Sequence, residues 1–205
     1  MTIFTQTNLT RRKLVQGGAA TLALAPLATP AFALSESQAS SHVNKLVVAI
    51  NKVIASGKSE SGMIKDFEKI FVKYSDINYL ASYALGVDGR SASAGQKRSF
   101  AKAFQGYIAR KYGKQFRSFI GGRLEVKSSK TVKSHIEVKC IAYLKGQAPF
   151  QVTFFVSDKS GKALFYNMYS EGINLLLTER TEIGAMLDKR KGNMDQMIKD
   201  LKIAG

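Results

Sequence analysis

The sequence is poor in the residues on which most catalytic and metal sites depend. It holds two histidines, one cysteine, three prolines and no tryptophan. Neither His42 nor His135 has a second ligand at the spacing of a zinc site, and no G-x-S-x-G turn for a serine nucleophile is present. The lone Cys140 cannot form an internal disulfide, and its alternating apolar surroundings predict a buried, inert thiol. We therefore expect no enzyme, no metal and no cofactor.

Long hydrophobic runs are also missing. The uncharged stretch Val15–Leu27 is shorter than the roughly 20 residues that a membrane-spanning helix needs. It follows the twin arginine Arg11–Arg12 and leads to Ala31–Ala33, an A-x-A element typical of a leader cleavage site. We expect residues 1–33 to be a cleaved signal peptide of the twin-arginine type, and residues 34–205 to be one exported domain.

Acidic residues are scarce. The chain has 31 Lys and Arg against 15 Asp and Glu, a formal net charge of +16. Such an excess would indicate nucleic acid in a cytoplasmic protein, but export removes that partner and leaves anionic lipid head groups or acidic partner proteins. No Asp or Glu lies in the basic stretch from Gly89 to Leu124. It is either a solvated face or a docking surface, for which we predict Arg98, Lys102, Arg110, Lys111, Lys114 and Arg117.

Apolar residues that recur every three or four positions predict helices over most of the chain. In one of them Phe100, Phe104, Ile108 and Tyr112 fall four apart and form an aromatic ridge. The predicted helices cover about 35–56, 64–74, 77–85, 93–119, 173–190 and 193–202.

The apolar period changes to two between about 124 and 170, which predicts strands. One strand begins at Leu124 and Val126. The others cover about 136–144, 150–156 and 163–170, with a hairpin loop at 158–161. In the last of them we expect Leu164, Tyr166 and Met168 on one side, and Phe165, Asn167 and Tyr169 on the other.

This order of elements predicts an α+β domain: a curved antiparallel sheet of four to five strands with helices packed on one face. Both faces of the last strands carry aromatic residues, more than a sheet covered on one face requires. An ordinary core with a few covered outer positions would explain them. The alternative is an apolar cavity enclosed between the concave sheet and the aromatic ridge.

Acidic residues of the last helices, such as Glu179 and Glu182, are expected to lie on solvated faces. Glu171 beside Gly172 is the exception, because a strand must end and a helix begin there. We interpret this pair as a structural joint and not as a catalytic acid.

Two stretches resemble the MlaC (toluene-tolerance) family of periplasmic phospholipid-binding proteins. The first extends from Leu85-Gly86 to Ala103-Phe104 and is similar to the family pattern LG-x-x-WR-x-A, Q-R-x-x-F and AF. The second, Tyr166–Leu175, is similar to YDV-x-IEGVSL and is followed by Arg180. The chain departs from the pattern at Gly89 and Asn167, where the family has Trp and Asp.

The resemblance implies a periplasmic carrier that encloses phospholipid acyl chains as cargo. It implies transfer between an outer-membrane lipoprotein complex and an inner-membrane ABC-type transporter, which maintains outer-membrane lipid asymmetry. An isomerase or hydrolase on a cone-shaped α+β fold is the alternative, and would need Asp, His or Tyr in the pocket. A structural adaptor with a solid core is a third. The predicted lipid-binding residues are Leu80, Phe100, Phe104, Ile108, Val138, Cys140, Val152, Phe154, Tyr166, Met168 and Ile173.

Overall fold

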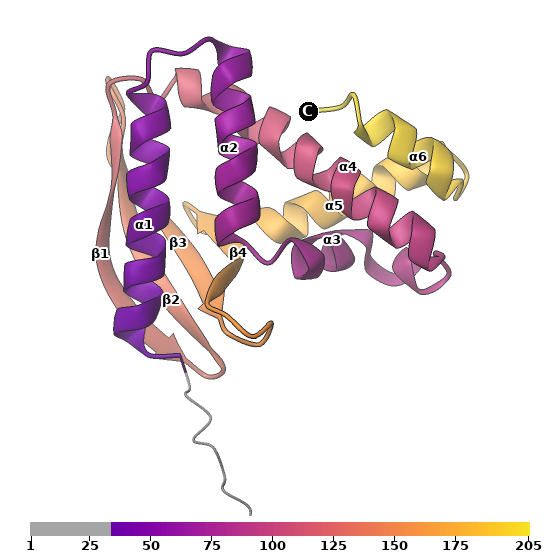
Figure 1. Cartoon of the computed structure of the whole chain (residues 1–205), viewed down its shortest axis with the longest axis horizontal. Coiled ribbons are helices and arrows are strands. Elements are labelled where there is room, and N and C mark those ends of the chain that lie inside the picture. Colours follow the sequence, from indigo (N-terminus) through magenta and orange to yellow (C-terminus); the bar gives the residue numbers. More distant parts are fainter. Residues whose placement is uncertain (1–33) are drawn as a thin grey trace, which may run out of the picture. The chain divides into compact units, whose positions relative to one another are not determined.

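The described part of the chain spans residues 34–205, without the side chains of Phe116 and Arg117. Figure 1 shows the computed structural model of the chain. The expected signal peptide, residues 1–33, lies outside the described residues, so its cleavage and export route stay predictions. None of the helices in the described part is long and apolar enough to cross a membrane.

The helices begin where the sequence supplies capping side chains. The hydroxyl of Ser35 accepts the backbone N–H of the third residue of α1 (Glu36–Ile54), and Ser93 does the same for α4 (Ala94–Gly113). Both caps are reciprocal, since the glutamine at that third position accepts the N–H of the serine. The other helices are α2 (Glu60–Tyr74), α3 (Ile77–Leu85), α5 (Leu175–Lys189) and α6 (Met194–Leu201), with 3-10 turns η1 (Gly86–Arg90) and η2 (Lys114–Arg117).

The strands form one antiparallel meander in which each strand pairs with the next along the chain. One face carries the buried side chains Val138 and Cys140 of the second strand, and α1 packs along it. Figure 1 shows α1 running lengthwise beside the sheet, with α2 next to it. The predicted α+β fold is confirmed. The strands are β1 (Arg123–Val132), β2 (His135–Tyr143), β3 (Phe150–Ser157), β4 (Leu164–Ser170) and β5 (Ile173–Asn174).

One predicted boundary is wrong. The long helix ends at Gly113 and continues as the 3-10 turn η2, because apolar spacing alone does not distinguish an α-helix from a tighter turn. β1, which the sequence predicts to begin at about Leu124, extends from Arg123 to Val132. Its second half is polar and mostly exposed at the sheet edge, so it lacks the alternation that marks a half-buried strand.

A bulge in β4 changes the facing of the residues before it relative to those after it. Phe155 of β3 pairs with Asn167 and the next residue, Val156, pairs with Phe165, so Tyr166 is one residue too many for a regular ladder. Phe165 therefore packs toward the helices, against Phe154. Beyond the bulge the alternation starts again in the opposite phase. The prediction that Tyr166 and Met168 share one face is wrong.

The predicted joint at Glu171 is a two-residue hairpin turn between β4 and β5. Glu171 and Gly172 have φ values of 50° and 81°, the left-handed conformation at both positions that favours a tight turn between paired strands. Ser170 and Ile173 pair across it. The helix α5 begins only after β5, at Leu175.

Candidate functional site

An apolar cavity of about 270 Å³ lies between the sheet and the helices. Its sheet side is formed by inward-facing residues, among them Val152 and Phe154 of β3 and Phe165 of β4. The remaining wall comes from the helices α1 to α5. α1 packs mainly on β1 and β2, and most of the sheet residues that line the cavity belong to β3 and β4.

The helix side of the wall is made of large apolar and aromatic side chains. Phe67 and Phe71 of α2 stack on each other with ring centroids 6.1 Å apart. The ring of Phe71 also contacts the ring of Phe165 on the opposite wall, with the ring centroids 6.0 Å apart. These side chains are contributed by every helix that contacts the cavity: Leu46, Ile50, Phe67, Phe71, Leu80, Phe104, Ile108, Tyr112, Leu175 and Leu176.

One buried carboxylate interrupts this apolar wall. Glu179 of α5 is 3% exposed and lines the cavity. Its Oε1 accepts hydrogen bonds from Tyr112 Oη at 2.5 Å and from Lys111 Nζ at 2.8 Å, both on α4. Its Oε2 is buried and has no hydrogen-bond partner. The expectation that Glu179 lies on a solvated face is wrong, because α4 covers that side of α5.

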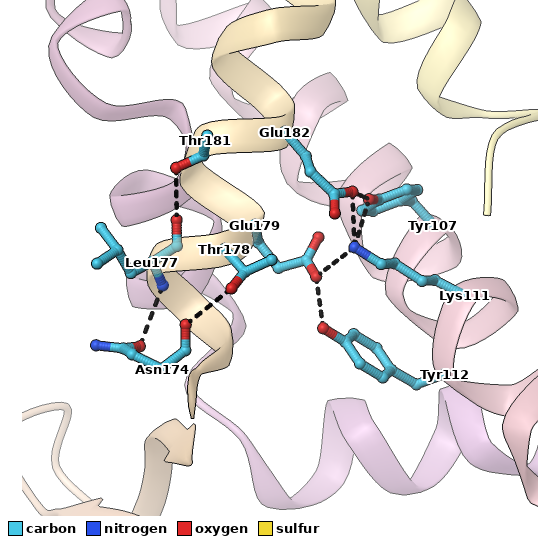
Figure 2. A network of polar contacts seen from close by, with 9 residues as sticks. All are labelled: Tyr107, Lys111, Tyr112, Asn174, Leu177, Thr178, Glu179, Thr181 and Glu182. Carbon is cyan, nitrogen blue, oxygen red and sulfur yellow. Dashed lines mark hydrogen bonds and ion pairs between the residues drawn. The ribbon is translucent and has the colours of Figure 1, made fainter. Parts of the chain in front are cut away.

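The network extends from Glu179 through Lys111 to Glu182, as Figure 2 shows. Lys111 Nζ also contacts Glu182 Oε2 at 2.6 Å, and Tyr107 donates its hydroxyl to the same oxygen at 2.6 Å. The side chain of Lys111 is 24% exposed and that of Glu182 is 45% exposed. The network therefore connects the buried Glu179 on the cavity wall to the partly exposed side chains of Lys111 and Glu182.

The protonation states of the network follow from burial and from these contacts. Burial raises the pKa of the Tyr107 and Tyr112 hydroxyls, and the neighbouring carboxylates raise it further, so both remain hydrogen-bond donors. Burial opposes the charge on Lys111, but its hydrogen bonds to Glu179 and Glu182 outweigh burial and raise its pKa. Lys111 is thus a cation held between two carboxylates.

The model of the MlaC protein family matches residues 41–203, nearly the whole described region. The chain belongs to the MlaC family. It is also similar in structure to the phospholipid-binding protein from Ralstonia solanacearum, which was solved in complex with a phospholipid. The TM-score is 0.67 at 16% sequence identity, covering 80% of this chain and 98% of that one.

Several residues predicted for the lipid site of this MlaC-family chain do line the cavity. They come from α3, α4, β3 and β4, so the helical ridge and the sheet converge as expected. Their contact with a lipid stays a prediction. These residues are Leu80, Phe104, Ile108, Val152, Phe154 and Met168.

Other predicted lipid-site residues lie elsewhere. Val138 and Cys140 are fully buried in the solid core, where α1 covers the sheet, and burial raises the pKa of the Cys140 thiol to about 12. Phe100 is buried behind Phe104, on which it stacks at 5.7 Å. Tyr166 faces the opposite side of the sheet because of the bulge, and Ile173 is 59% exposed in β5.

Sequence reasoning missed part of the wall. The stripes of α1 and α2 were recognised as apolar, but periodicity does not distinguish a residue that faces a cavity from one in a packed core. The polar wall residues were not assigned to the cavity, because a polar side chain in an amphipathic element is ordinarily assigned to its solvated face. The missed polar residues are Gln115, Asn167, Ser170 and Glu179.

The predicted docking residues divide into two groups. Arg98 and Lys102 are exposed on α4, as a docking surface requires. Arg110 instead donates to the backbone carbonyls of Leu201 and Ala204, and Lys114 donates to that of Gly205. These two, together with Lys111, hold the carboxy-terminal helices in place. The side chain of Arg117 lies outside the described residues.

Within residues 34–205, no group of three or more His, Cys, Asp and Glu side chains is placed to hold a metal ion.

Proposed function

We propose that this chain is a periplasmic phospholipid carrier that encloses acyl chains in the cavity and moves lipid between an outer-membrane complex and an inner-membrane transporter. The observation that carries the proposal is an apolar cavity, walled by the sheet and by α1 to α5, in a member of the MlaC family. The similar Ralstonia protein was solved with a phospholipid bound, which supports the same cargo class here.

Physical chemistry explains why such a carrier must enclose its cargo. Each methylene exposed to water costs about 0.8 kcal/mol, so the roughly 30 methylenes of two acyl chains cost more than about 20 kcal/mol. A shallow groove would leave much of that surface wet. A cavity between a sheet and several helices removes it from water, while the head group can stay hydrated at the opening.

The cavity must widen to hold a whole phospholipid. Its volume of about 270 Å³ lies just below the roughly 300–1,000 Å³ of ordinary small-molecule pockets. Phe67, Phe119, Phe150 and Met168 are half-buried on the cavity wall, and we expect the cavity to widen by displacement of such side chains. Hydrogen exchange should therefore differ between delipidated and loaded protein in α2 and β4. Identical exchange in both states would contradict this widening.

The direct test is the lipid content of the protein. Native mass spectrometry of gently purified protein is expected to show bound phospholipid, and delipidated protein should reload from vesicles. Protein that carries no lipid and takes none from vesicles would refute the proposal.

A pair of matched variants links that lipid to the cavity. Val152→Asp places a charge among acyl chains, which costs several kcal/mol, and should abolish loading. Val48→Asp makes the same change at a position that is 59% exposed on α1, and should load normally. Circular dichroism must show that both variants are folded. Normal lipid content in folded Val152→Asp protein would exclude this cavity as the binding site.

One observation favours the alternative of a pocket enzyme. Tyr112 and Glu179, two residue types that serve in acid–base chemistry, line the cavity. The two functions differ in what happens to the lipid. A carrier returns its lipid with unchanged mass after prolonged incubation, whereas an isomerase or hydrolase releases a rearranged or shortened product. Chromatography with mass spectrometry of the bound and released lipid distinguishes them.

A further inference from the structure

Arg180 on α5 has no polar partner in the described part of the chain. Its guanidinium carbon lies 5.3 Å from the ring centroid of Tyr83 on α3, but no described carboxylate or carbonyl accepts a hydrogen bond from it. The side chain is half-buried, yet none of its nitrogens is among the described buried atoms that lack a partner, so these donors reach solvent. A guanidinium presents five N–H donors in one plane. Arg180 therefore offers a free donor group at the protein surface.

Two neighbours restrict the position of this guanidinium. One is the Tyr83 ring, and the other is Gly86, on which a Cβ atom would lie 3.0 Å from Nε and 3.2 Å from Nη2 of Arg180. Any side chain at position 86 would therefore press on the guanidinium. The two stretches that resemble the MlaC pattern meet here, since Gly86 belongs to the first and Arg180 follows the second. A guanidinium that is held in place loses less conformational freedom on binding than a mobile one does.

Exposed apolar side chains lie next to Arg180. Leu177 is 50% exposed and precedes Arg180 by three residues on α5, so the two lie on the same side of that helix. Val87 is 59% exposed and directly follows the glycine beside Arg180. Tyr79 is 44% exposed, and its ring stacks on that of Tyr83 with the centroids 6.2 Å apart. Since α3 and α5 also pack against each other, these residues form one surface. We call it the Arg180 patch: Tyr79, Tyr83, Val87, Leu177 and Arg180.

This composition is typical of the centre of a protein–protein interface. Tyrosine and arginine are enriched there, and a few such anchors with neighbours that exclude water supply most of the binding energy. A single exposed apolar residue needs no explanation, but several beside an unpartnered cation indicate an interaction site. The planar guanidinium fits a carboxylate with two parallel hydrogen bonds, which apolar surroundings strengthen. The complementary surface is therefore an Asp or Glu side chain flanked by apolar residues.

An anionic membrane fits the patch less well than a protein does. Membrane surfaces attract clusters of several lysines and arginines. The Arg180 patch holds one cation, and the adjoining η1 carries Asp88 and Arg90, both exposed, whose formal charges cancel. The exposed Arg98 and Lys102 on α4 are better suited to that contact.

We propose that the Arg180 patch is a docking surface for a partner protein, whose Asp or Glu carboxylate binds the Arg180 guanidinium. The inference goes beyond the proposed carrier function and does not depend on the cargo. None of the five patch residues lines the cavity, and Figure 2 shows Leu177 pointing away from Glu179. A carrier has to recognise the proteins that load and unload it, and a charge pair of fixed geometry gives such a contact its specificity and orientation.

Photocrosslinking in the native host cells tests the surface. The photoreactive residue p-benzoylphenylalanine replaces Val87, inside the patch, or Val48, a valine with the same 59% exposure on α1. Position 87 should give one discrete protein adduct that position 48 does not give. Mass spectrometry of the adduct identifies the partner and its cross-linked segment, which is expected to contain Asp or Glu.

Substitutions in the chain that carries the crosslinker at position 87 test the role of the guanidinium. Arg180→Gln should lower the adduct yield at least about tenfold, because a charged hydrogen bond is lost. Leu177→Glu should lower it as much, because its carboxylate lies three residues before Arg180 on the helix and occupies the guanidinium. Val48→Glu, the same kind of change outside the patch, should leave the yield unchanged. Circular dichroism and bound lipid should match the wild type in all three variants.

An exchange of charges then tests whether a carboxylate is the contact. The acidic residue identified in the partner is changed to Arg, and the purified proteins are mixed in a calorimeter. Arg180→Glu protein should not bind the wild-type partner but should bind the partner variant.

Several results would overturn the inference. They are the absence of an adduct specific to position 87, an adduct yield that folded Arg180→Gln and Leu177→Glu proteins both keep, and an exchange of charges that restores no binding. An adduct with phospholipid would assign the patch to a membrane, and an adduct between two copies of this chain would assign it to self-association. None of these outcomes bears on bound lipid, so native mass spectrometry of the wild-type protein judges the carrier function separately.

Discussion

The hydroxyl of Tyr112 on α4 donates a hydrogen bond to Oε1 of Glu179 on α5, with the two oxygens 2.5 Å apart. The two side chains lie together on the cavity wall, and the contact ties the helix of the aromatic ridge to the helix that follows the sheet. The buried carboxylate is thus part of the packing between α4 and α5.

Removing the Tyr112 hydroxyl tests the packing role. Tyr112→Phe should lower the free energy of unfolding by about 1–3 kcal/mol, since the buried Glu179 loses one of its two donors. Urea unfolding measures the change. Tyr79→Phe is the control, because Tyr79 is 44% exposed on α3, and its effect should stay within about 0.5 kcal/mol. Equal effects of the two substitutions would show that the buried hydrogen bond adds nothing to stability.

Alkaline pH should weaken the same network. The folded-state pKa of Tyr107 lies above its ordinary value of 10.0, first because of burial and then because of its hydrogen bond to Glu182. Above about pH 10 the unfolded chain therefore releases a proton that the folded chain retains. The stabilisation is complete below pH 10 and declines as the pH rises beyond it.

Urea unfolding of wild type and Tyr107→Phe between pH 8 and 11 checks this prediction. The variant should be less stable at pH 8 and should lose stability less steeply above pH 10, because the shifted group is gone. Parallel profiles for the two proteins would mean that Tyr107 does not contribute to the alkaline decline.

The sequence allowed the order and type of the main elements to be predicted, because their apolar periods are strong and their ends carry caps such as Ser35 and Ser93. It did not allow the facing of β4 to be predicted. One extra residue at Tyr166 changes the phase of the strand, and the alternation itself contains no sign of it. The facing depends on how β4 pairs with Phe155 and Val156, which is a tertiary property.

The presence of an apolar cavity could be predicted from the sequence, but only some of the residues that line it could. Phe104 and Val152 lie on predicted inner faces and line it, yet Val138 lies on an inner face and is in the solid core. Whether an inward residue meets a cavity depends on which helix covers it. Glu179 could not be distinguished from a surface glutamate, since its burial results from α4 packing against α5.

The predicted docking surface can now be tested with better-chosen residues. Lys111 forms ion pairs with Glu179 and Glu182, so Lys111→Glu would place three carboxylates together and should destabilise the fold. Lys114, which contacts the backbone of Gly205, is also a poor probe. Arg98 and Lys102 are exposed on α4 and can be reversed without such damage.

We predict that the double variant Arg98→Glu and Lys102→Glu delivers lipid more slowly to anionic acceptor membranes, with unchanged lipid content and stability. Each basic group near an anionic surface contributes about 1 kcal/mol, and the attraction fades beyond a Debye length of roughly 8 Å. The defect should therefore be largest at low salt and shrink as salt is added. Reversal of Lys52 and Lys65, exposed on α1 and α2, serves as the matched control for net charge. Equal slowing in both double variants would assign the effect to overall charge. Wild-type delivery rates at every salt concentration would show that Arg98 and Lys102 serve only solubility.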